Sequence, residues 1–464
     1  MKALLNTIRF FLKSGNKVKI KKVLIANRGE IALRILRTCK EMGIETVSVH
    51  STADEESLHV KLADESVCIG PPRSAKSYLN IPALLSAAEI TNADSIHPGF
   101  GFLSENFEFA SSCKQWGLTF IGPNMDCIKK MGSKIQAKEM AKKANIPILE
   151  SLSVNGLSDK EVTQAVGEMT LPVLIKASAG GGGRGMCRVD KIEDLIPQIR
   201  RLEEEAKAAF GDDTLFIEKY ITSPRHIEVQ ILADQHGNMV HLGERDCTVQ
   251  RRFQKILEES PSPILDEKIR NQICNSAVRL AQYVGYDSVG TVEYLFDQNT
   301  RKFYFMEMNT RIQVEHPVTE QRIGLDLIAE QIKVAEGRPL DLKQSDIQFN
   351  GHCIECRINA ENPKTFAPSP GQIIHYYRPG GIGIRVDDFI YSGYMVSPYY
   401  DSMVAKIISH APTRSKCIER MKRALKETII DGIHHNISLH LKILSDTNFK
   451  GNNYSTNLLD QILR

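Results

Sequence analysis

The sequence predicts an α/β fold in three parts: an N-terminal domain with an open parallel sheet, a central domain of alternating strands and helices, and a C-terminal α+β domain. Three observations support this prediction. The 464 residues suffice for roughly three domains of about 150 residues. A strand, a helix and a second strand occupy the first part of the chain, and a region of glycine-bounded strands begins near Gly351.

The N-terminal domain begins with a buried-strand pattern at Val23–Ala26. A helical pattern follows at Glu30–Met42, and the next strand is Thr46–His50. A strand, helix and strand in this order form a right-handed parallel unit. Only Gly29 occupies the turn where a dinucleotide site needs several glycines, so we expect the fold without that cofactor.

The remaining elements set the predicted domain limits. Short strands at 93–98 and 118–122 complete an N-terminal domain over residues 23–132. A central domain over 133–350 begins with a helix at Lys134 and includes a lid at about 148–221, and the C-terminal domain spans 351–464. The chain contains no low-complexity tract or long flexible linker, so we expect the domains to pack together.

The composition excludes several classes of function. A formal net charge of +3 gives no electrostatic reason to expect a nucleic-acid partner, and no apolar run is long enough to span a membrane. Ten scattered cysteines favour a reducing compartment, with Cys353 and Cys356 interpreted as parts of an alternating strand. We therefore expect a cytoplasmic protein. Residues 1–22, with seven Lys or Arg and no acid, form a basic extension that fits a transit peptide, a surface helix or a disordered segment.

Four consecutive glycines, Gly180, Gly181, Gly182 and Gly183, lie between Lys176 and Arg184. The stretch formally matches a dinucleotide fingerprint, but a strand pattern follows at 186–189 where that motif requires a helix. Exposed backbone N–H groups in a glycine-rich turn between two strands can close over phosphates. The alternative interpretation is a hairpin tip without a ligand.

A predicted hairpin joins residues 290–296 to residues 302–309. If residues 297–301 form the loop, Glu293 and Glu307 project from one face of neighbouring strands, where they suit Mg²⁺ ions that bridge nucleotide phosphates. A register slip of one residue would separate the two carboxylates. Solvated acids on a hairpin are the alternative.

Together with Met131–Lys134 and Ile217–Tyr220, the glycine stretch and the hairpin resemble the ATP-grasp ligases. The resemblance implies that Lys134, Lys176 and the four glycines hold phosphates. It places Glu218 and the backbone of Lys219 and Ile221 at the adenine. Further residues of the implied nucleotide site are His226, Gln250, Gln313 and Val314, and the implied ligands of Mg²⁺ or Mn²⁺ are Glu293, Glu307 and Asn309.

Longer motifs resemble the biotin carboxylases, a family within the ATP-grasp enzymes. The resemblance extends from about Val23 to the C-terminus, and its motifs are residues 26–32, 95–99, 245–255, 307–320 and 355–361. It implies that Lys255 and Arg311 hold bicarbonate while Glu315 removes its proton, and that Arg357 stabilises the enolate-like oxygen of biotin. The substrates would be ATP, bicarbonate and biotin on a carrier protein.

Two positions depart from the family pattern. Phe253 stands where a histidine is usual, and Phe100 stands where a tyrosine is usual. We expect altered affinity rather than loss of activity. The competing hypotheses are a carbamoyl-phosphate synthetase module and a nucleotide-binding regulatory subunit without turnover.

The resemblance also implies partners. We expect a biotin carboxyl carrier protein and carboxyltransferase subunits of an acetyl-CoA carboxylase, which would supply malonyl-CoA for fatty acid synthesis, with pyruvate or propionyl-CoA carboxylase as alternatives. Neither a Met-Lys-Met biotinylation site nor length for its domain is found, so biotin is expected on another chain. Family members form homodimers, with Arg37 and Asp401 at contact positions.

Overall fold

The computed structural model describes residues 18–169, 171–178 and 185–463. The N-terminal domain contains a five-stranded parallel sheet in the order β3-β2-β1-β4-β5, as the sequence predicts. Its elements are β1 (Lys22–Ile25), α2 (Gly29–Glu41), β2 (Glu45–Ser51), α3 (Leu58–Leu62), β3 (Glu65–Gly70), α4 (Ile81–Ile90), β4 (Ser95–His97), α5 (Phe107–Gln115) and β5 (Thr119–Phe120).

The last residues of the predicted basic extension pack against the folded chain. Ile20 is buried, and its backbone N–H donates to Glu336 Oε1 at 3.0 Å. Apolar residues of β1 and α2 share a core with α12 (Leu327–Ala335) and with residues of the central strands. The N-terminal domain therefore packs firmly on the central one, in agreement with the absence of a long linker.

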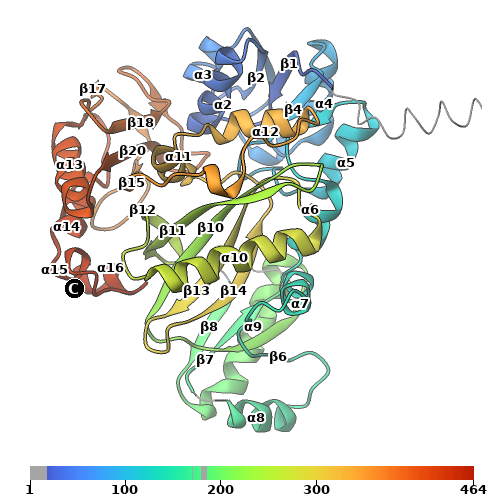
Figure 1. Cartoon of the computed structure of the whole chain (residues 1–464), viewed down its shortest axis with the longest axis vertical. Helices are drawn as coiled ribbons and strands as arrows, with labels where there is room; N and C mark the ends of the chain where they lie inside the picture. Colours follow the sequence, from blue (N-terminus) through green and yellow to red (C-terminus); the bar gives the residue numbers. More distant parts are fainter. Residues whose placement is uncertain (1–17, 170, 179–184, 464) are drawn as a thin grey trace, which may run out of the picture.

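An eight-stranded antiparallel sheet runs through the middle of the molecule in the order β14-β13-β10-β11-β12-β15-β20-β18 (Figure 1). The predicted hairpin is confirmed, although Asp297 pairs with Lys302 and so belongs to the strand and not to the loop. That register alone would place Glu293 opposite Met306, and a shift of register between Glu293 and Tyr294 makes Glu307 the direct partner of Glu293. The central strands and the helices packed near them are α6 (Met125–Gly132), α7 (Lys134–Lys143), β10 (Pro224–Ala233), β11 (Met239–Arg251), β12 (Gln254–Ser260), α10 (Glu267–Val284), β13 (Ser288–Asp297), β14 (Lys302–Asn309) and α11 (His316–Ile323).

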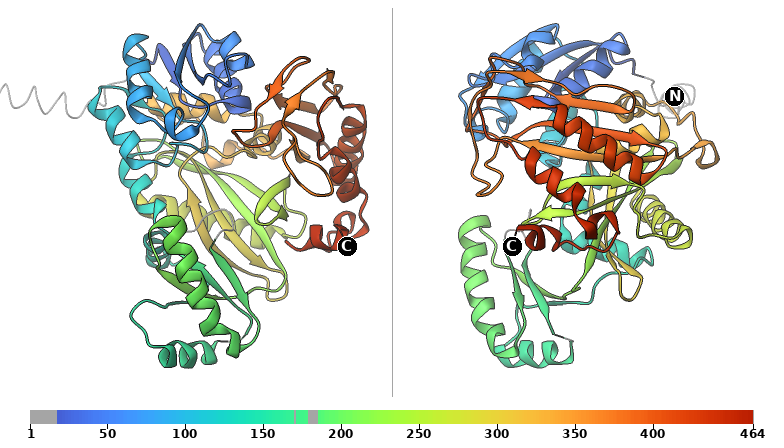
Figure 2. Two further views of the ribbon diagram at one scale, coloured as in Figure 1. Left: turned by 180° about the vertical axis from the view of Figure 1, so that it is seen from behind. Right: turned by 90° about the vertical axis from the view of Figure 1, so that its left-hand side faces the viewer.

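The predicted lid is a separate four-stranded antiparallel sheet in the order β6-β9-β7-β8, at the end of the molecule away from the N-terminal domain (Figures 1 and 2). The strand predicted after the glycine stretch is confirmed. Residues 179–184, including Gly180 to Gly183, lie outside the described residues. The lid elements are β6 (Ser151–Ser153), α8 (Asp159–Glu168), β7 (Val173–Ala177), β8 (Met186–Val189), α9 (Leu195–Phe210) and β9 (Leu215–Lys219).

The C-terminal strands continue the central sheet, because β15 pairs with β12. Helices α13 and α14 cover one face of these strands (Figure 2). Cys353 and Cys356 are buried on β15, which confirms the strand interpretation. The elements are β15 (His352–Asn359), β16 (Gly371–Gln372), β17 (Tyr376–Tyr377), β18 (Ile384–Asp388), β19 (Met395–Val396), β20 (Met403–Ala411), α13 (Arg414–Glu427), β21 (Ile429–Ile430), α14 (Ile437–Ser445), α15 (Thr447–Lys450) and α16 (Leu458–Leu463).

In the part of the chain that the structure describes, no helix has the length and apolarity needed to cross a bilayer. All ten cysteines are free thiols.

Candidate active site

A cavity of about 830 Å³ lies where the three parts of the molecule meet. Its walls come from the turn before α2, from α7, from lid strands β7 and β9, from the central sheet, and from β15 and β20. Fourteen of the residues predicted from the sequence line it: Lys134, Lys176, Glu218, His226, Gln250, Lys255, Glu293, Glu307, Asn309, Arg311, Gln313, Val314, Glu315 and Arg357.

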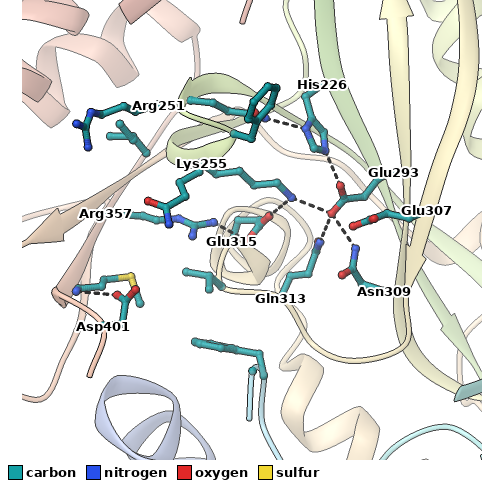
Figure 3. A pocket seen from close by; sticks show the side chains of 18 of the residues that line it. His226, Arg251, Lys255, Glu293, Glu307, Asn309, Gln313, Glu315, Arg357 and Asp401 are labelled. Carbon is teal, nitrogen blue, oxygen red and sulfur yellow. Dashed lines mark hydrogen bonds and ion pairs between the residues drawn. The ribbon is translucent and has the colours of Figure 1, made fainter. Parts of the chain in front are cut away.

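Lys255 is the centre of the acceptor end of the cavity (Figure 3). Its ammonium contacts Glu228 Oε2 at 2.6 Å, Glu293 Oε1 at 2.9 Å and Glu315 Oε1 at 2.6 Å. Burial alone would lower the pKa of Lys255, but the three carboxylates raise it well above its ordinary value. Lys255 is therefore a fixed positive charge.

Arg357 joins the same cluster from β15. Its Nη2 donates to Glu315 Oε2 at 2.9 Å, and its Nε donates to Glu258 Oε1 at 2.6 Å. Both oxygens of Glu315 are thus bound by cations, which fixes the orientation of its carboxylate between Lys255 and Arg357. This arrangement brings together three of the four predicted catalytic residues.

The pKa values of the two glutamates that bind Arg357 shift in opposite directions. Burial opposes ionisation of Glu315, but Lys255, Arg357 and Arg245 hold its pKa well below the usual range. Burial raises the pKa of Glu258 to about 7, and Arg357 only partly offsets this effect. Glu315 is therefore ionised at neutral pH and able to accept a proton, whereas Glu258 titrates near neutrality.

A row of three carboxylates crosses neighbouring strands, because Glu228 pairs with Glu293 and Glu293 pairs with Glu307. Like charges directly opposite each other are destabilising. Lys255 neutralises the first two, and the Asn309 side chain donates to Glu293 Oε1 at 2.8 Å. Burial and the charge of Glu293 raise the pKa of Glu307, and the charges of Lys134 and Lys255 only partly offset this effect. The oxygen-rich set formed by Glu293, Glu307 and Asn309 fits Mg²⁺ or Mn²⁺.

Lysines dominate the opposite end of the cavity. Glu218 Oε2 accepts from Lys176 at 2.5 Å, and its Oε1 pairs with Lys138. Burial would raise the pKa of Glu218, but the two lysines lower it. Lys134 lies one turn before Lys138 on α7, and burial lowers the pKa of both lysines. Three lysines around one glutamate form a site for an anion such as a polyphosphate.

The other predicted residues connect the two ends. Gln250 Nε2 lies 2.7 Å from His226 Nδ1, and His226 Nε2 lies 2.7 Å from Glu293 Oε2. Gln313 Nε2 donates to Glu293 Oε1 at 2.6 Å. Arg311 also lines the cavity, and Glu105 Oε2 accepts a hydrogen bond from its Nε at 2.9 Å. The other hydrogen bonds of the guanidinium go to the Ile312 carbonyl oxygen and to Asn309 Oδ1.

Lys219 and Ile221 are not among the residues that line the cavity, although the neighbouring Glu218 is. Their predicted contacts are made by the backbone, and Lys219 is the last residue of lid strand β9. Phe253 and Phe100 both line the cavity. Phe253 lies at the turn between β11 and β12 with φ +67° and 58% exposure, so its ring is at the mouth of the cavity.

Sequence reasoning missed Glu228, Glu258, Lys138 and the role of Arg245. Arg245 is completely buried, pairs with Glu228, and donates to Gln313 Oε1 at 2.6 Å. Strand alternation puts Glu228 on the same face as His226, and helical spacing puts Lys138 on the same face as Lys134. These two signals could have identified them. Nothing local to the sequence distinguishes Glu258 from Glu259.

A lid sheet beside a central sheet, with lysines at one end of the cavity and paired carboxylates at the other, defines an ATP-grasp enzyme. Residues 133–343 match the model of the carbamoyl-phosphate synthase L chain ATP-binding domain. On either side, residues 19–128 and 355–461 match the N-terminal and C-terminal domains of biotin carboxylase. The flanking matches favour biotin carboxylase over a carbamoyl-phosphate synthetase module.

The sequence similarity to curated relatives extends along nearly the whole chain. It is 54% identical over 442 residues to "Biotin carboxylase 1" of Bacillus subtilis (strain 168), which covers 95% of this chain and 98% of the relative. The chain therefore belongs to the biotin carboxylase family of ATP-dependent ligases.

Solved structures show the same fold. A biotin carboxylase from Campylobacter jejuni, in complex with β,γ-ATP, has a TM-score of 0.93 at 48% identity, covering 96% of this chain and 99% of that one. The biotin carboxylase domain of 2-oxoglutarate carboxylase from Hydrogenobacter thermophilus, in complex with MgADP, ADP and bicarbonate, has a TM-score of 0.92 at 44% identity, with coverages of 96% and 99%.

Proposed function

We propose that the protein uses ATP and bicarbonate to carboxylate biotin on a biotin carboxyl carrier protein, as the first half-reaction of an acetyl-CoA carboxylase. The observation that carries this proposal is the cluster of Lys255, Glu315 and Arg357 in the same cavity as the lysines around Glu218. The cluster can bind a small anion and accept its proton, and the lysines can bind the phosphates of ATP.

In the first step, Lys255 and Arg311 bind bicarbonate, and Glu315 takes its proton. A bicarbonate oxygen then forms a bond to the γ-phosphorus of ATP, and the bond from that phosphorus to the bridging oxygen of ADP breaks. Because Glu315 is ionised at neutral pH, it is ready to accept the proton. Lys134, Lys176 and the four glycines, Gly180 to Gly183, stabilise the phosphates, with Glu218, Lys219, Ile221, His226 and Gln250 completing the nucleotide site.

In the second step, carboxyphosphate releases CO₂ and phosphate, the phosphate removes the proton from the ureido nitrogen of biotin, and that nitrogen bonds to CO₂. Negative charge develops on the ureido oxygen, and Arg357 stabilises it. Two glutamates fix the guanidinium beforehand, so little reorganisation is needed when this charge appears.

Glu293, Glu307 and Asn309 would hold Mg²⁺ or Mn²⁺, which neutralises negative charge on the phosphates when bound. The direct pairing of Glu293 with Glu307, close to the side-chain oxygen of Asn309, supports the assignment. Gln313 and Val314 belong to the loop that places these groups beside Glu315.

The proposed partners are a biotin carboxyl carrier protein and carboxyltransferase subunits. The likeness to a relative named "Biotin carboxylase 1" supports a biotin carboxylase activity. On that basis we propose that biotin comes from a carrier protein and that the product goes to carboxyltransferase subunits. Similar solved structures include the biotin carboxylase subunit of a pyruvate carboxylase and the domain of 2-oxoglutarate carboxylase, so a final acceptor other than acetyl-CoA is an alternative. Propionyl-CoA is a further alternative that rests on the family resemblance alone. We further propose a homodimer and, because all ten cysteines are free thiols, a cytoplasmic location.

The test is ATP hydrolysis by the purified protein with and without bicarbonate, Mg²⁺ and free biotin. The expected result is hydrolysis that requires bicarbonate and Mg²⁺ and rises with biotin. Hydrolysis that responds to ammonia and not to biotin would refute the assignment. Carboxylation of purified carrier proteins from the three candidate complexes distinguishes among the partners.

A further inference from the structure

The loop that carries Glu315 is held by a buried lysine outside the cluster described above. Strand β14 ends at Asn309 and α11 begins at His316, so Val314 and Glu315 lie in the loop between them. Lys406 Nζ donates to the Val314 carbonyl oxygen at 2.8 Å. This contact fixes the backbone of the residue immediately before Glu315.

The sheet register places Lys406 beside the catalytic cluster. Lys406 on β20 pairs directly with Arg357 on β15, so the two side chains project from the same face of the sheet. Arg357 binds the side chain of Glu315, and Lys406 binds the backbone of Val314. Two neighbouring cations therefore hold two consecutive residues of one loop.

Lys406 is linked in turn to the N-terminal domain. Its side chain has 0% exposure, and its Nζ lies 3.1 Å from Oε1 of Glu30, in the first turn of α2. Helix α2 packs against β18 and β20 at this point (Figure 1). Glu30 belongs to the Asn27-Arg28-Gly29-Glu30 turn, which carries too few glycines to bind a dinucleotide, and this contact gives the turn a different role.

The surrounding charges keep Lys406 protonated. Burial would lower its pKa, but Glu30 from α2, Glu355 from β15 and Asp387 from β18 raise it, against the repulsion of Arg385 from β18. A buried ion pair is by itself weak evidence of a role beyond the fold. The additional hydrogen bond to Val314 gives this pair a geometric connection to Glu315.

We propose that Lys406, held by Glu30, is a positioning residue that keeps Glu315 oriented for removal of the bicarbonate proton. The inference rests on the proposed role of Glu315 as the base. Through Lys406, Glu30 of the N-terminal domain contributes to the position of the base.

The test is a double-mutant cycle between Lys406→Met and Glu315→Asp in the full chain, with bicarbonate-dependent ATP cleavage and ATP binding as readouts. Glu315→Asp retains a carboxylate and so a measurable rate. In the otherwise unaltered protein, Lys406→Met should lower kcat by about 10²-fold, the scale of loss from a misplaced reacting group. ATP affinity should stay within about threefold, because the nucleotide site does not depend on this loop contact.

In the Glu315→Asp background, the further loss from Lys406→Met should shrink to about threefold or less, because both changes disrupt the same carboxylate position. An equal loss in both backgrounds, or no loss in the unaltered protein, would overturn the inference. If Glu315→Asp alone had no effect on kcat, this result would refute the proposed role of Glu315 as the base. The positioning role of Lys406, which depends on that base, would then be refuted as well.

Two further variants guard against effects on folding. Lys416→Met changes an exposed lysine on the following helix α13 and should leave both readouts unchanged. Glu30→Gln keeps an acceptor for Lys406 and removes the charge, so it perturbs the fold less. It should lower kcat by about tenfold, with the same dependence on Glu315. If Lys406→Met does not melt cooperatively, the cycle with Glu30→Gln decides the inference.

Discussion

The two ends of the cavity differ in how their charges are arranged. At the phosphate end, Lys134, Lys138 and Lys176 surround the single carboxylate of Glu218. At the acceptor end, Lys255 contacts three carboxylates, Arg357 and Arg245 each contact one of these three, and a fourth carboxylate, Glu307, lies beside Glu293 (Figure 3). The lysine-rich end is suited to the phosphates, and the carboxylate oxygens of Glu293 and Glu307 at the other end are suited to a divalent cation.

The ends also differ in the elements that carry their charged side chains. Glu315 is bound through both oxygens, and the loop before it is tied to the C-terminal strands by Lys406. The lysines that bind Glu218 belong to α7 and to lid strand β7. We infer that the acceptor end is preorganised and that the lysines exchange Glu218 for phosphates when ATP binds.

The largest expected effect comes from the acceptor end. Glu315→Gln removes the proposed base and should lower bicarbonate-dependent ATP cleavage by about 10²- to 10⁴-fold, the usual contribution of general base catalysis. ATP binding, measured by calorimetry, should be nearly unchanged because the lysines are intact. Retained cleavage in this variant would show that proton removal does not depend on the carboxylate.

A smaller effect is expected at the carboxylate row between the two ends. Glu307→Gln should lower turnover by about 10²-fold while leaving ATP binding largely intact, because metal charge matters most as phosphoryl charge develops. The Mg²⁺ concentration needed for half-maximal rate should rise. A matched change at Glu105, which contacts Arg311, should not alter the Mg²⁺ requirement. An unchanged Mg²⁺ requirement in Glu307→Gln would remove its metal role.

A pH experiment separates the two glutamates that bind Arg357. The pKa of Glu258 is raised to about 7, so the folded protein holds a proton between pH 4.5 and 7 that the unfolded chain releases. The resulting stabilisation is present below that interval and is lost as the pH rises through 7. The Tm of Glu258→Gln should therefore increase relative to the unaltered protein by roughly a few degrees from pH 5 to pH 8. A constant difference in Tm across this range would contradict the raised pKa.

Much of this comparison could be predicted from the sequence. The hairpin with its two glutamates was predicted, and strand alternation was sufficient to place Cys353 and Cys356 in a buried strand. The shift of register that makes Glu293 and Glu307 direct partners was not predicted. The resemblance to biotin carboxylase supplied Lys255, Glu315 and Arg357.

The remainder depends on long-range packing. Glu258 and Lys406 lie in strands distant in sequence from Glu315, and only pairing of β12, β15 and β20 brings them near it. Continuity of one sheet across residue 351 was not predicted, because the sequence pattern shows where strands occur and not which strands pair. The arrangement of charges at the two ends of the cavity likewise depends on which strands pair.

The proposed mechanism requires that Lys255 acts on bicarbonate before phosphoryl transfer and that Arg357 acts on biotin afterwards. The most direct test measures ATP cleavage and carboxybiotin formation in Lys255→Ala and Arg357→Ala. Lys255→Ala should abolish both activities. Arg357→Ala should retain much of the ATP cleavage while carboxybiotin formation falls by about 10²-fold or more, the typical loss for one oxyanion-stabilising donor. Equal losses of both activities in Arg357→Ala, with the fold intact by thermal melting, would contradict the assignment of Arg357 to the biotin step.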